Sequence, residues 1–280
     1  MLKYETPTQP RQVRLEVTNR CNANCISCHR HIMTRPLGNM SMKLVKKCIS
    51  NMRQFPKLLT EFVPSNYGET FLYPRWYEIL ELAQNELPHT QIVIPTNGSF
   101  LSSVLDKLSK IKTLSLINVS VNALYPATYE AFNHLKSTNM DDIIDAIIRL
   151  RELRPDITIW ISMAYDYLCQ SPKEVELFRQ FWSQYGTVQI NTVSYAGVKG
   201  KEPLIPVSIP CRSIFSDMVV AWNGDISSCC FDANIEIKLG SALNSSLLDI
   251  WHGKEFANLR QIHNAGRRGE VPLCSSCTFA

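Results

Sequence analysis

The sequence lacks a strong excess of charge, a long apolar run and a targeting segment. Its 280 residues carry 29 basic and 25 acidic side chains, with no block of lysine and arginine, so we expect no nucleic-acid partner. No stretch approaches the roughly 18–20 apolar residues of a membrane span, and residues 1–7 lack the apolar core of a signal peptide. We therefore expect a cytoplasmic protein that does not bind membranes.

Cysteine, by contrast, is abundant, with ten residues in the chain. Clustered cysteines in a cytosolic chain bind metal or do redox chemistry more often than they form disulfides. The length allows a large core and favours one big domain or two unequal ones.

The first two thirds of the chain alternate between strand and helix patterns. Strand patterns lie at residues 13–18, 58–63, 91–95, 116–121, 157–163 and 188–191. Helix patterns follow them at residues 41–51, 76–86, 101–108, 126–132, 140–153 and 171–184. Alternation of this kind predicts an α/β fold, a partial (β/α)6 TIM-like barrel, over residues 1–196.

The alternation of strand and helix patterns ends before residues 197–210, a stretch rich in glycine and proline that we interpret as a linker. Residues 217–222 and 225–229 flank Asn223-Gly224, a strong hairpin signal, and helix patterns follow at 246–251 and 255–263. Residues 211–280 are therefore expected to form a second, small α+β module.

Cys21, Cys25 and Cys28 follow the first predicted strand, on a loop at its carboxyl end. Thiolates favour zinc or iron–sulfur centres over hard cations. His29 or His31 could complete a zinc site; the alternative is an iron–sulfur cube with one iron left free.

The order Cys-x3-Cys-x2-Cys, preceded by Thr18-Asn19-Arg20, resembles the radical S-adenosylmethionine (SAM) family. The resemblance implies that the three thiolates hold a [4Fe–4S] cluster whose fourth iron binds SAM. Further matches imply SAM-binding residues, with Asn122 where the family often has Asp and Lys136 where many members have Arg. The expected SAM-binding residues are Ser27, Gly68, Glu69, Thr96, Asn97, Ser120, Asn122 and Lys136.

The C-terminal cysteines suggest a second metal site, either a zinc ribbon or another iron–sulfur cluster. Their surroundings, from Trp222-Asn223-Gly224 to Cys274-x2-Cys277, resemble the SPASM/twitch extension of radical SAM enzymes. Because the sequence ends at Ala280, it resembles the shorter twitch form, which implies one auxiliary [4Fe–4S] cluster. The resemblance assigns its ligands to Cys211, Cys229, Cys274 and Cys277, and leaves the role of Cys230 open.

The resemblance implies a 5′-deoxyadenosyl radical that takes a hydrogen atom from a substrate. The first hypothesis is oxidation of a small sugar, cyclitol or nucleoside-like molecule, with an external flavodoxin or ferredoxin-like electron donor. The alternative is epimerisation or ribosomal-peptide maturation, with Cys169 or Cys230 returning a hydrogen atom. The short segment before the first strand mildly favours a small molecule. A third reading, a non-catalytic protein with two zinc sites, does not explain the Gly68-Glu69, Thr96-Asn97-Gly98 and Ser120 matches.

Overall fold

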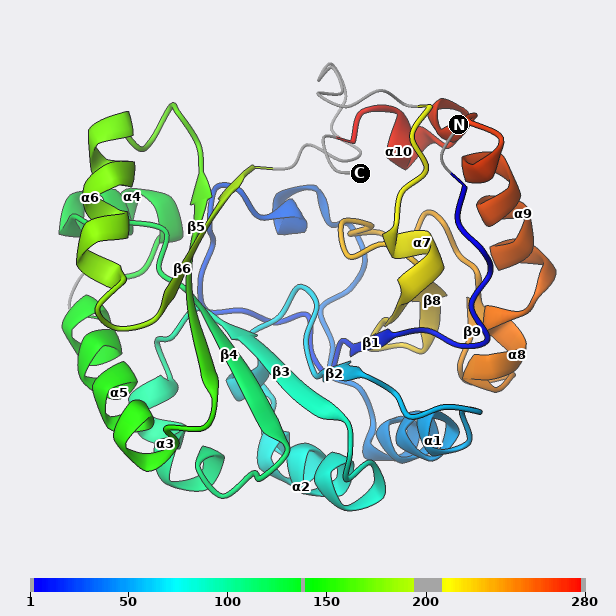
Figure 1. The fold of residues 1–280 in the computed structure, drawn as a ribbon, viewed down its shortest axis with the longest axis horizontal. Helices are drawn as coiled ribbons and strands as arrows, with labels where there is room; N and C mark the ends of the chain where they lie inside the picture. The colour runs from blue at the N-terminus through cyan, green and yellow to red at the C-terminus, as the bar shows by residue number, and fades with distance from the viewer. Residues whose placement is uncertain (1–2, 137–138, 194–207, 278–280) are drawn as a thin grey trace.

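A computed structural model describes residues 3–136, 139–193 and 208–277; most of the predicted linker at 197–210 lies outside these ranges. Its strands form one nine-stranded sheet in the order β6-β5-β4-β3-β2-β1-β7-β8-β9. The first six strands pair in parallel and curve into the predicted partial barrel (Figure 1). They are β1 (Gln12–Leu15), β2 (Glu61–Val63), β3 (Gln91–Thr96), β4 (Leu114–Ser120), β5 (Thr158–Tyr165) and β6 (Thr187–Thr192).

Helices cover the outer side of this curved sheet (Figure 1). They are α1 (Met42–Arg53), α2 (Trp76–Glu86), α3 (Leu101–Leu108), α4 (Pro126–Asn133), α5 (Asn139–Leu153) and α6 (Pro172–Trp182). Alternation along the strands explains the arrangement: Val13 and Leu15 of β1 are fully buried against the helices, whereas Gln12 and Arg14 face the inside of the barrel. The α/β prediction is confirmed.

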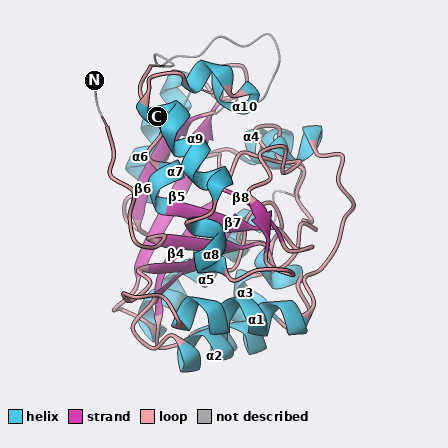
Figure 2. Cartoon of the chain, turned by 90° about the vertical axis from the view of Figure 1, so that its right-hand side faces the viewer, coloured by secondary structure: helices cyan, strands magenta, loops and turns pink. Residues whose placement is uncertain are grey.

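The C-terminal module contains the predicted hairpin. Strands β7 (Asp217–Val220) and β8 (Asp225–Ser227) pair antiparallel, and a short β9 (Gly240–Ser241) follows them in the sheet. Helices α7 (Ser213–Ser216), α8 (Leu247–Trp251), α9 (Lys254–Asn264) and α10 (Pro272–Ser275) complete the module. Figure 2 shows α7, α8 and α9 on the face of the molecule where β7 and β8 lie.

The module does not form a sheet of its own. Strand β7 pairs in parallel with β1, from Gln12 opposite Asp217 to Leu15 opposite Val220. Buried side chains of both parts, such as Leu15, Met218 and Trp251, belong to one continuous apolar core. Among the described residues no helix is long and apolar enough to cross a membrane.

Candidate radical SAM and auxiliary-cluster sites

The loop that carries Cys21, Cys25 and Cys28 follows β1 and is bonded through its backbone to the end of α4. The amides of Asn24 and Ile26 donate to the carbonyls of Asn133 and Phe132, at 3.1 and 3.0 Å, at the C-terminal end of α4. The short helix η1 (His29–Ile32) begins directly after Cys28. The two backbone hydrogen bonds anchor the loop to the end of α4.

The three thiols lie close enough to affect one another. Burial, and then the charges of Cys28 and Cys21, raise the pKa of Cys25 to about 12. Burial also raises the pKa of Cys21 and of Cys28. Sulfur atoms that disfavour each other's ionisation in this way suit a cationic centre, which reverses the effect by stabilising the thiolates.

The chemistry of the donor set fits an iron–sulfur centre. Cys21, Cys25 and Cys28 place three thiols on one loop, and burial raises the pKa of each. Thiolates are the ligands that iron–sulfur clusters take from proteins.

Gly68 brings the turn after β2 against the cysteine loop. A Cβ at this position would lie 2.1 Å from the carbonyl oxygen of Thr18 and 2.9 Å from that of Arg20. The next amide, of Glu69, donates to the Arg20 carbonyl at 2.9 Å. Only glycine permits this close approach of two backbones.

Glu69 joins the turns that follow β2 and β3. Its buried carboxylate accepts hydrogen bonds from the hydroxyl of Thr96 (3.0 Å), the amide of Asn97 (2.9 Å) and the amide of Phe71 (3.3 Å). Burial raises its pKa from 4.5 to about 7, although these three donors oppose the shift. Near neutral pH the carboxyl is therefore poised between charged and neutral forms, and a nearby ammonium group would favour the charged form.

Asn97 connects the same turn to the first cysteine. Its side-chain amide nitrogen donates to Asn22 Oδ1 at 2.9 Å and lies 3.7 Å from the sulfur of Cys21. The structure thus brings Gly68, Glu69, Thr96 and Asn97 together beside the cysteine loop.

Asn122 forms side-chain hydrogen bonds with other parts of the protein. Its backbone is left-handed, with φ of 65°, a conformation that Asn tolerates better than most residues. Its side chain donates to Asn133 Oδ1 at 2.8 Å and accepts from the amide of Ala164 at 2.8 Å. The sulfur of Cys25 donates to the same Asn133 oxygen at 3.4 Å. Asn122 therefore positions the cysteine loop through Asn133, a residue that the sequence analysis missed.

The other expected SAM-binding residues are more open. Ser120 is half-buried, and its Oγ lies 3.3 Å from that of Ser162. Ser27 is half-buried on the cysteine loop, and Lys136 is exposed just after α4. Their proposed contacts with SAM remain predictions.

Four C-terminal cysteines line one pocket of about 450 Å³: Cys211, Cys229, Cys230 and Cys277. The fifth, Cys274, is buried, and burial followed by the charges of Cys211 and Cys277 raises its pKa to about 12. Burial and the neighbouring Cys230, Cys274 and Cys211 thiols likewise raise the pKa of Cys229. A pocket of this size lined by sulfur fits an auxiliary cluster.

Two charged residues that the sequence analysis missed hold this pocket in shape. Asp232 is 1% exposed and accepts from the hydroxyl of Ser227 (2.9 Å) and the amides of Glu236 (2.8 Å) and Ile237 (2.9 Å). Arg268 is fully buried and donates to the carbonyl of Cys277 at 3.0 Å. For Asp232, the only signal in the sequence was its position directly after Cys-Cys-Phe.

The segment after Cys28 packs against the segment after Cys230, so the two cysteine sites are neighbours. The rings of His29 and Phe231 lie 5.2 Å apart. Further along, Arg35 forms a two-point ion pair with the buried Glu16 (2.5 and 2.6 Å) and also donates to the carbonyl of Ala233.

Tyr67 lies between these two sites. Arg35 lies over its ring at 5.9 Å from the centroid. Burial, and then the charges of Cys230, Cys229 and Cys28, raise its pKa well above the ordinary value. Its buried hydroxyl has no hydrogen-bond partner among the described residues.

The two candidate hydrogen donors lie in different settings. Cys230 is half-buried in the auxiliary pocket, and burial raises its pKa while Arg14 acts in the opposite direction. Cys169 is exposed on the loop after β5, beside the exposed Tyr167 and Leu168. Only Cys230 lies with the other site residues.

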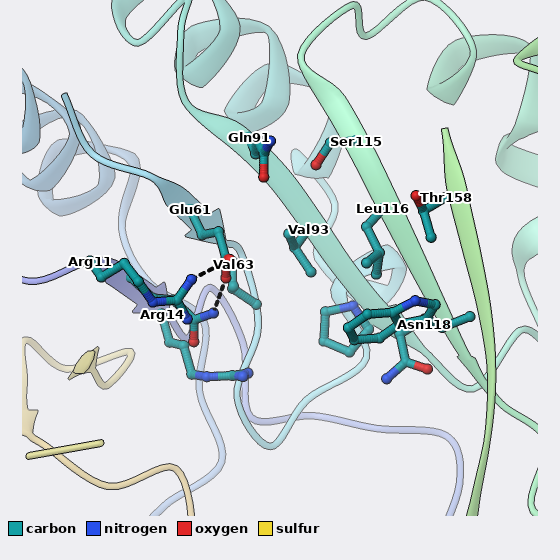
Figure 3. Close-up of a pocket in the computed structure, with 13 residues that line it drawn as sticks. Arg11, Arg14, Glu61, Val63, Gln91, Val93, Ser115, Leu116, Asn118 and Thr158 are labelled. Atoms are coloured by element: carbon teal, nitrogen blue, oxygen red, sulfur yellow. Dashed lines mark hydrogen bonds and ion pairs between the residues drawn. The ribbon is translucent and has the colours of Figure 1, made fainter. Parts of the chain in front are cut away.

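A cavity of about 530 Å³ lies inside the barrel (Figure 3). Its walls come from β1 to β5. They reach Val63, which ends β2 before the turn with Glu69, and Pro95, which directly precedes Thr96 at the end of β3. Arg11 lines both this barrel cavity and the auxiliary cysteine pocket. The two spaces are thus adjacent.

Comparison with known families agrees with this geometry. The radical SAM superfamily model matches residues 15–167, and the SPASM model, described as an iron-sulfur cluster-binding domain, matches residues 211–278. Because the first match covers more than half of the chain, this protein belongs to the radical SAM superfamily. It is a radical SAM enzyme that uses SAM and an iron–sulfur cluster, and its C-terminal part is a SPASM auxiliary-cluster domain.

Relatives with known names differ in how much of this chain they resemble. The S-adenosyl-L-methionine-dependent 2-deoxy-scyllo-inosamine dehydrogenase of Niallia circulans is 20% identical over 95% of this chain and 91% of its own. A probable GTP 3′,8-cyclase of Methanothermobacter thermautotrophicus is 35% identical over 42% of this chain, and the match spans only 37% of the cyclase.

Solved structures share the fold. BtrN in complex with AdoMet and 2-DOIA matches with a TM-score of 0.66 and 19% identity, covering 99% of this chain and 94% of that one. Streptococcus suis SuiB bound to the precursor peptide SuiA matches with a TM-score of 0.74 and 17% identity, covering 98% and 70%. At these identities the likeness concerns the fold alone.

Proposed function

We propose that this protein is a radical SAM dehydrogenase that oxidises a small sugar, cyclitol or nucleoside-like molecule with the help of two [4Fe–4S] clusters. The observation that carries the proposal is the position of Arg11, which lines both the barrel cavity and the auxiliary cysteine pocket. A substrate in the barrel cavity would therefore lie beside an electron acceptor in the pocket. The 20% identity to the inosamine dehydrogenase over nearly the whole chain supports the same reaction type.

Cys21, Cys25 and Cys28 would hold the first cluster, and Cys211, Cys229, Cys274 and Cys277 the second. When bound, SAM and the clusters supply a 5′-deoxyadenosyl radical that takes a substrate hydrogen atom, and an acceptor for the remaining electron. Oxidation of a secondary alcohol then balances: one hydrogen atom leaves carbon, one electron is accepted, and the hydroxyl proton is released.

The protein's own residues would hold SAM and the cysteine loop in position. Glu69 would accept a hydrogen bond from the SAM ammonium, which favours its charged form. Gly68 keeps that turn against the cysteine loop, and Asn122 fixes the loop through Asn133. The electron that begins each turnover would come from an external flavodoxin or ferredoxin-like donor.

The test is anaerobic incubation of reconstituted protein with SAM and dithionite across a panel of sugars, cyclitols and nucleosides. One 5′-deoxyadenosine should form for each oxidised product. A variant with Cys274→Ala and Cys277→Ala should bind half the iron of the wild type, still cleave SAM, and lose product oxidation. The control is Cys48→Ala, which removes a buried thiol from α1 in the outer core. Full oxidation by the double variant would contradict the proposal.

The setting of Cys230 favours one alternative, an epimerase or a ribosomal-peptide maturase in which a thiol returns a hydrogen atom. Cys230 lines the auxiliary pocket, and Arg14 opposes the rise in its pKa that burial causes. In deuterated water an epimerase would place deuterium at the reacting carbon, and Cys230→Ala would abolish that label. Absence of label supports the dehydrogenase.

A further inference from the structure

The barrel cavity is lined by one cationic side chain that forms no ion pair within the described part of the chain. Among those described residues, three charged side chains line the cavity: Arg11, Arg14 and Glu61. Arg11 is ion-paired with Glu61, which also accepts from the side chain of Gln12. Arg14 takes part in no ion pair of the described residues. Its guanidinium stands on the β1 wall of the cavity (Figure 3).

Across the cavity from Arg14, β4 presents an unsatisfied acceptor. Asn118 lines the cavity, and its buried Oδ1 has no hydrogen-bond partner in the described part of the chain (Figure 3). Because a buried polar atom without a partner costs free energy, this oxygen suits a ligand hydroxyl.

The neighbouring strand adds an aromatic surface. Trp160 of β5 also lines the cavity and is 36% exposed, whereas Ile159 and Ile161, which point the other way, are buried. An indole ring inside a cavity offers an apolar face on which the C–H face of a sugar ring can pack. A cation, an acceptor and an aromatic face thus line one cavity.

The position of the cavity connects these groups to the chemistry. Its lining includes Val63, the last residue of β2, which precedes the turn that carries Glu69. It also includes Pro95, which directly precedes Thr96 at the end of β3. Arg14 is the penultimate residue of β1 and lies opposite Val63, the last residue of β2. A ligand held at Arg14 can therefore extend towards the expected SAM site.

We infer that the barrel cavity binds the substrate as a polyhydroxylated ring bearing an anionic group, a phosphate or a carboxylate, with the anion on Arg14, a hydroxyl on Asn118 and the ring on Trp160. The identity of this ligand as substrate rests on the proposed function, but its binding does not require turnover. Guanidinium groups hold phosphate and carboxylate in the same two-point geometry, so the experiment separates the two.

The experiment is equilibrium binding of glucose, glucose 6-phosphate and glucuronate to the reconstituted full chain, followed by calorimetry and by tryptophan fluorescence. One or both of the anions should bind more tightly than glucose, by about tenfold or more. Hydrogen bonds to charged groups contribute enough free energy for a difference of this size. The tighter anion identifies the phosphate or the carboxylate. Trp160→Phe should remove the fluorescence response.

Arg14→Met should weaken binding of that anion by about 10- to 100-fold and leave glucose unchanged, with Arg14→Lys between the two. Arg149→Met is the matched control, because it removes the same charge from an exposed ion pair with Asp106 on the outer surface. If neither anion binds wild-type protein more tightly than glucose, or if a folded Arg14→Met variant keeps the anion affinity, the inference is wrong.

The wild-type comparison decides the question even if Arg14→Met does not fold. It is also independent of catalysis: anion binding without SAM cleavage would refute the dehydrogenase and keep the anion site. SAM cleavage and substrate oxidation without anion preference would refute the anion site and keep the dehydrogenase.

Discussion

Glu69 should make the metal-free protein less stable as the pH rises from about 4.5 to about 7. The carboxyl is 2% exposed, and burial raises its pKa from 4.5 to about 7. In this window the folded protein keeps a proton that the unfolded chain has already lost. The stabilisation is thus complete below pH 4.5 and is lost as the pH rises through 7. At about 1.4 kcal/mol for each pKa unit, the change amounts to about 3 kcal/mol.

The assay is urea unfolding of wild-type protein and Glu69→Gln, metal-free and under reductant, between pH 4.5 and 8. The amide does not titrate, so the difference in unfolding free energy between the two proteins should change by about 3 kcal/mol across this range, while the other titrating groups cancel. Glu86→Gln is the control: this half-exposed partner of Arg53 should change the free energy by less than about 1 kcal/mol. A flat difference curve for Glu69→Gln would refute the reasoning.

Three further predictions concern the two cysteine sites. Gly68→Ala should cost more than about 3 kcal/mol in urea unfolding and reduce iron at the first site, because its Cβ would lie 2.1 Å from the Thr18 carbonyl; normal stability and iron content would contradict the close approach. Tyr67→Phe should stabilise the metal-free protein by about 1 kcal/mol in the same assay, because it removes a buried hydroxyl without a partner; a loss of similar size would mean that the hydroxyl is bonded. Asp232→Ala should lose the iron of the auxiliary site while SAM cleavage persists, because three donors lose their acceptor; unchanged total iron would refute this role.

Local sequence signals located most of the fold. The patterns at 76–86 and 101–108 coincide with α2 and α3. The pattern at 41–51 begins at Ser41, which caps α1 by accepting from the amide of Leu44 at 3.3 Å. The parallel pairing of β7 with β1 could not be predicted in this way, because it joins residues about 200 positions apart and leaves no periodic trace in either segment. Very short elements such as β9 and α10 also lack enough residues to show a period.

The same distinction between local and long-range signals applies to the candidate sites. Local motifs predicted the cysteine loop, from its spacing, and the Gly68-Glu69 and Thr96-Asn97 segments. Asn133, Tyr67 and Asp232 were not predicted, because their importance arises from partners that only the folded chain brings near. The individual SAM contacts and cluster ligands stay predictions until the loaded protein is studied.

The shared ladder between β1 and β7 has a mechanical consequence. A C-terminal part joined to its neighbour only by a tether could swing as a rigid body to admit substrate, but here such a swing would rupture backbone hydrogen bonds from Gln12 to Leu15. Entry must therefore rely on smaller rearrangements of loops. It also follows that heat or denaturant should melt both halves of the molecule in a single cooperative event.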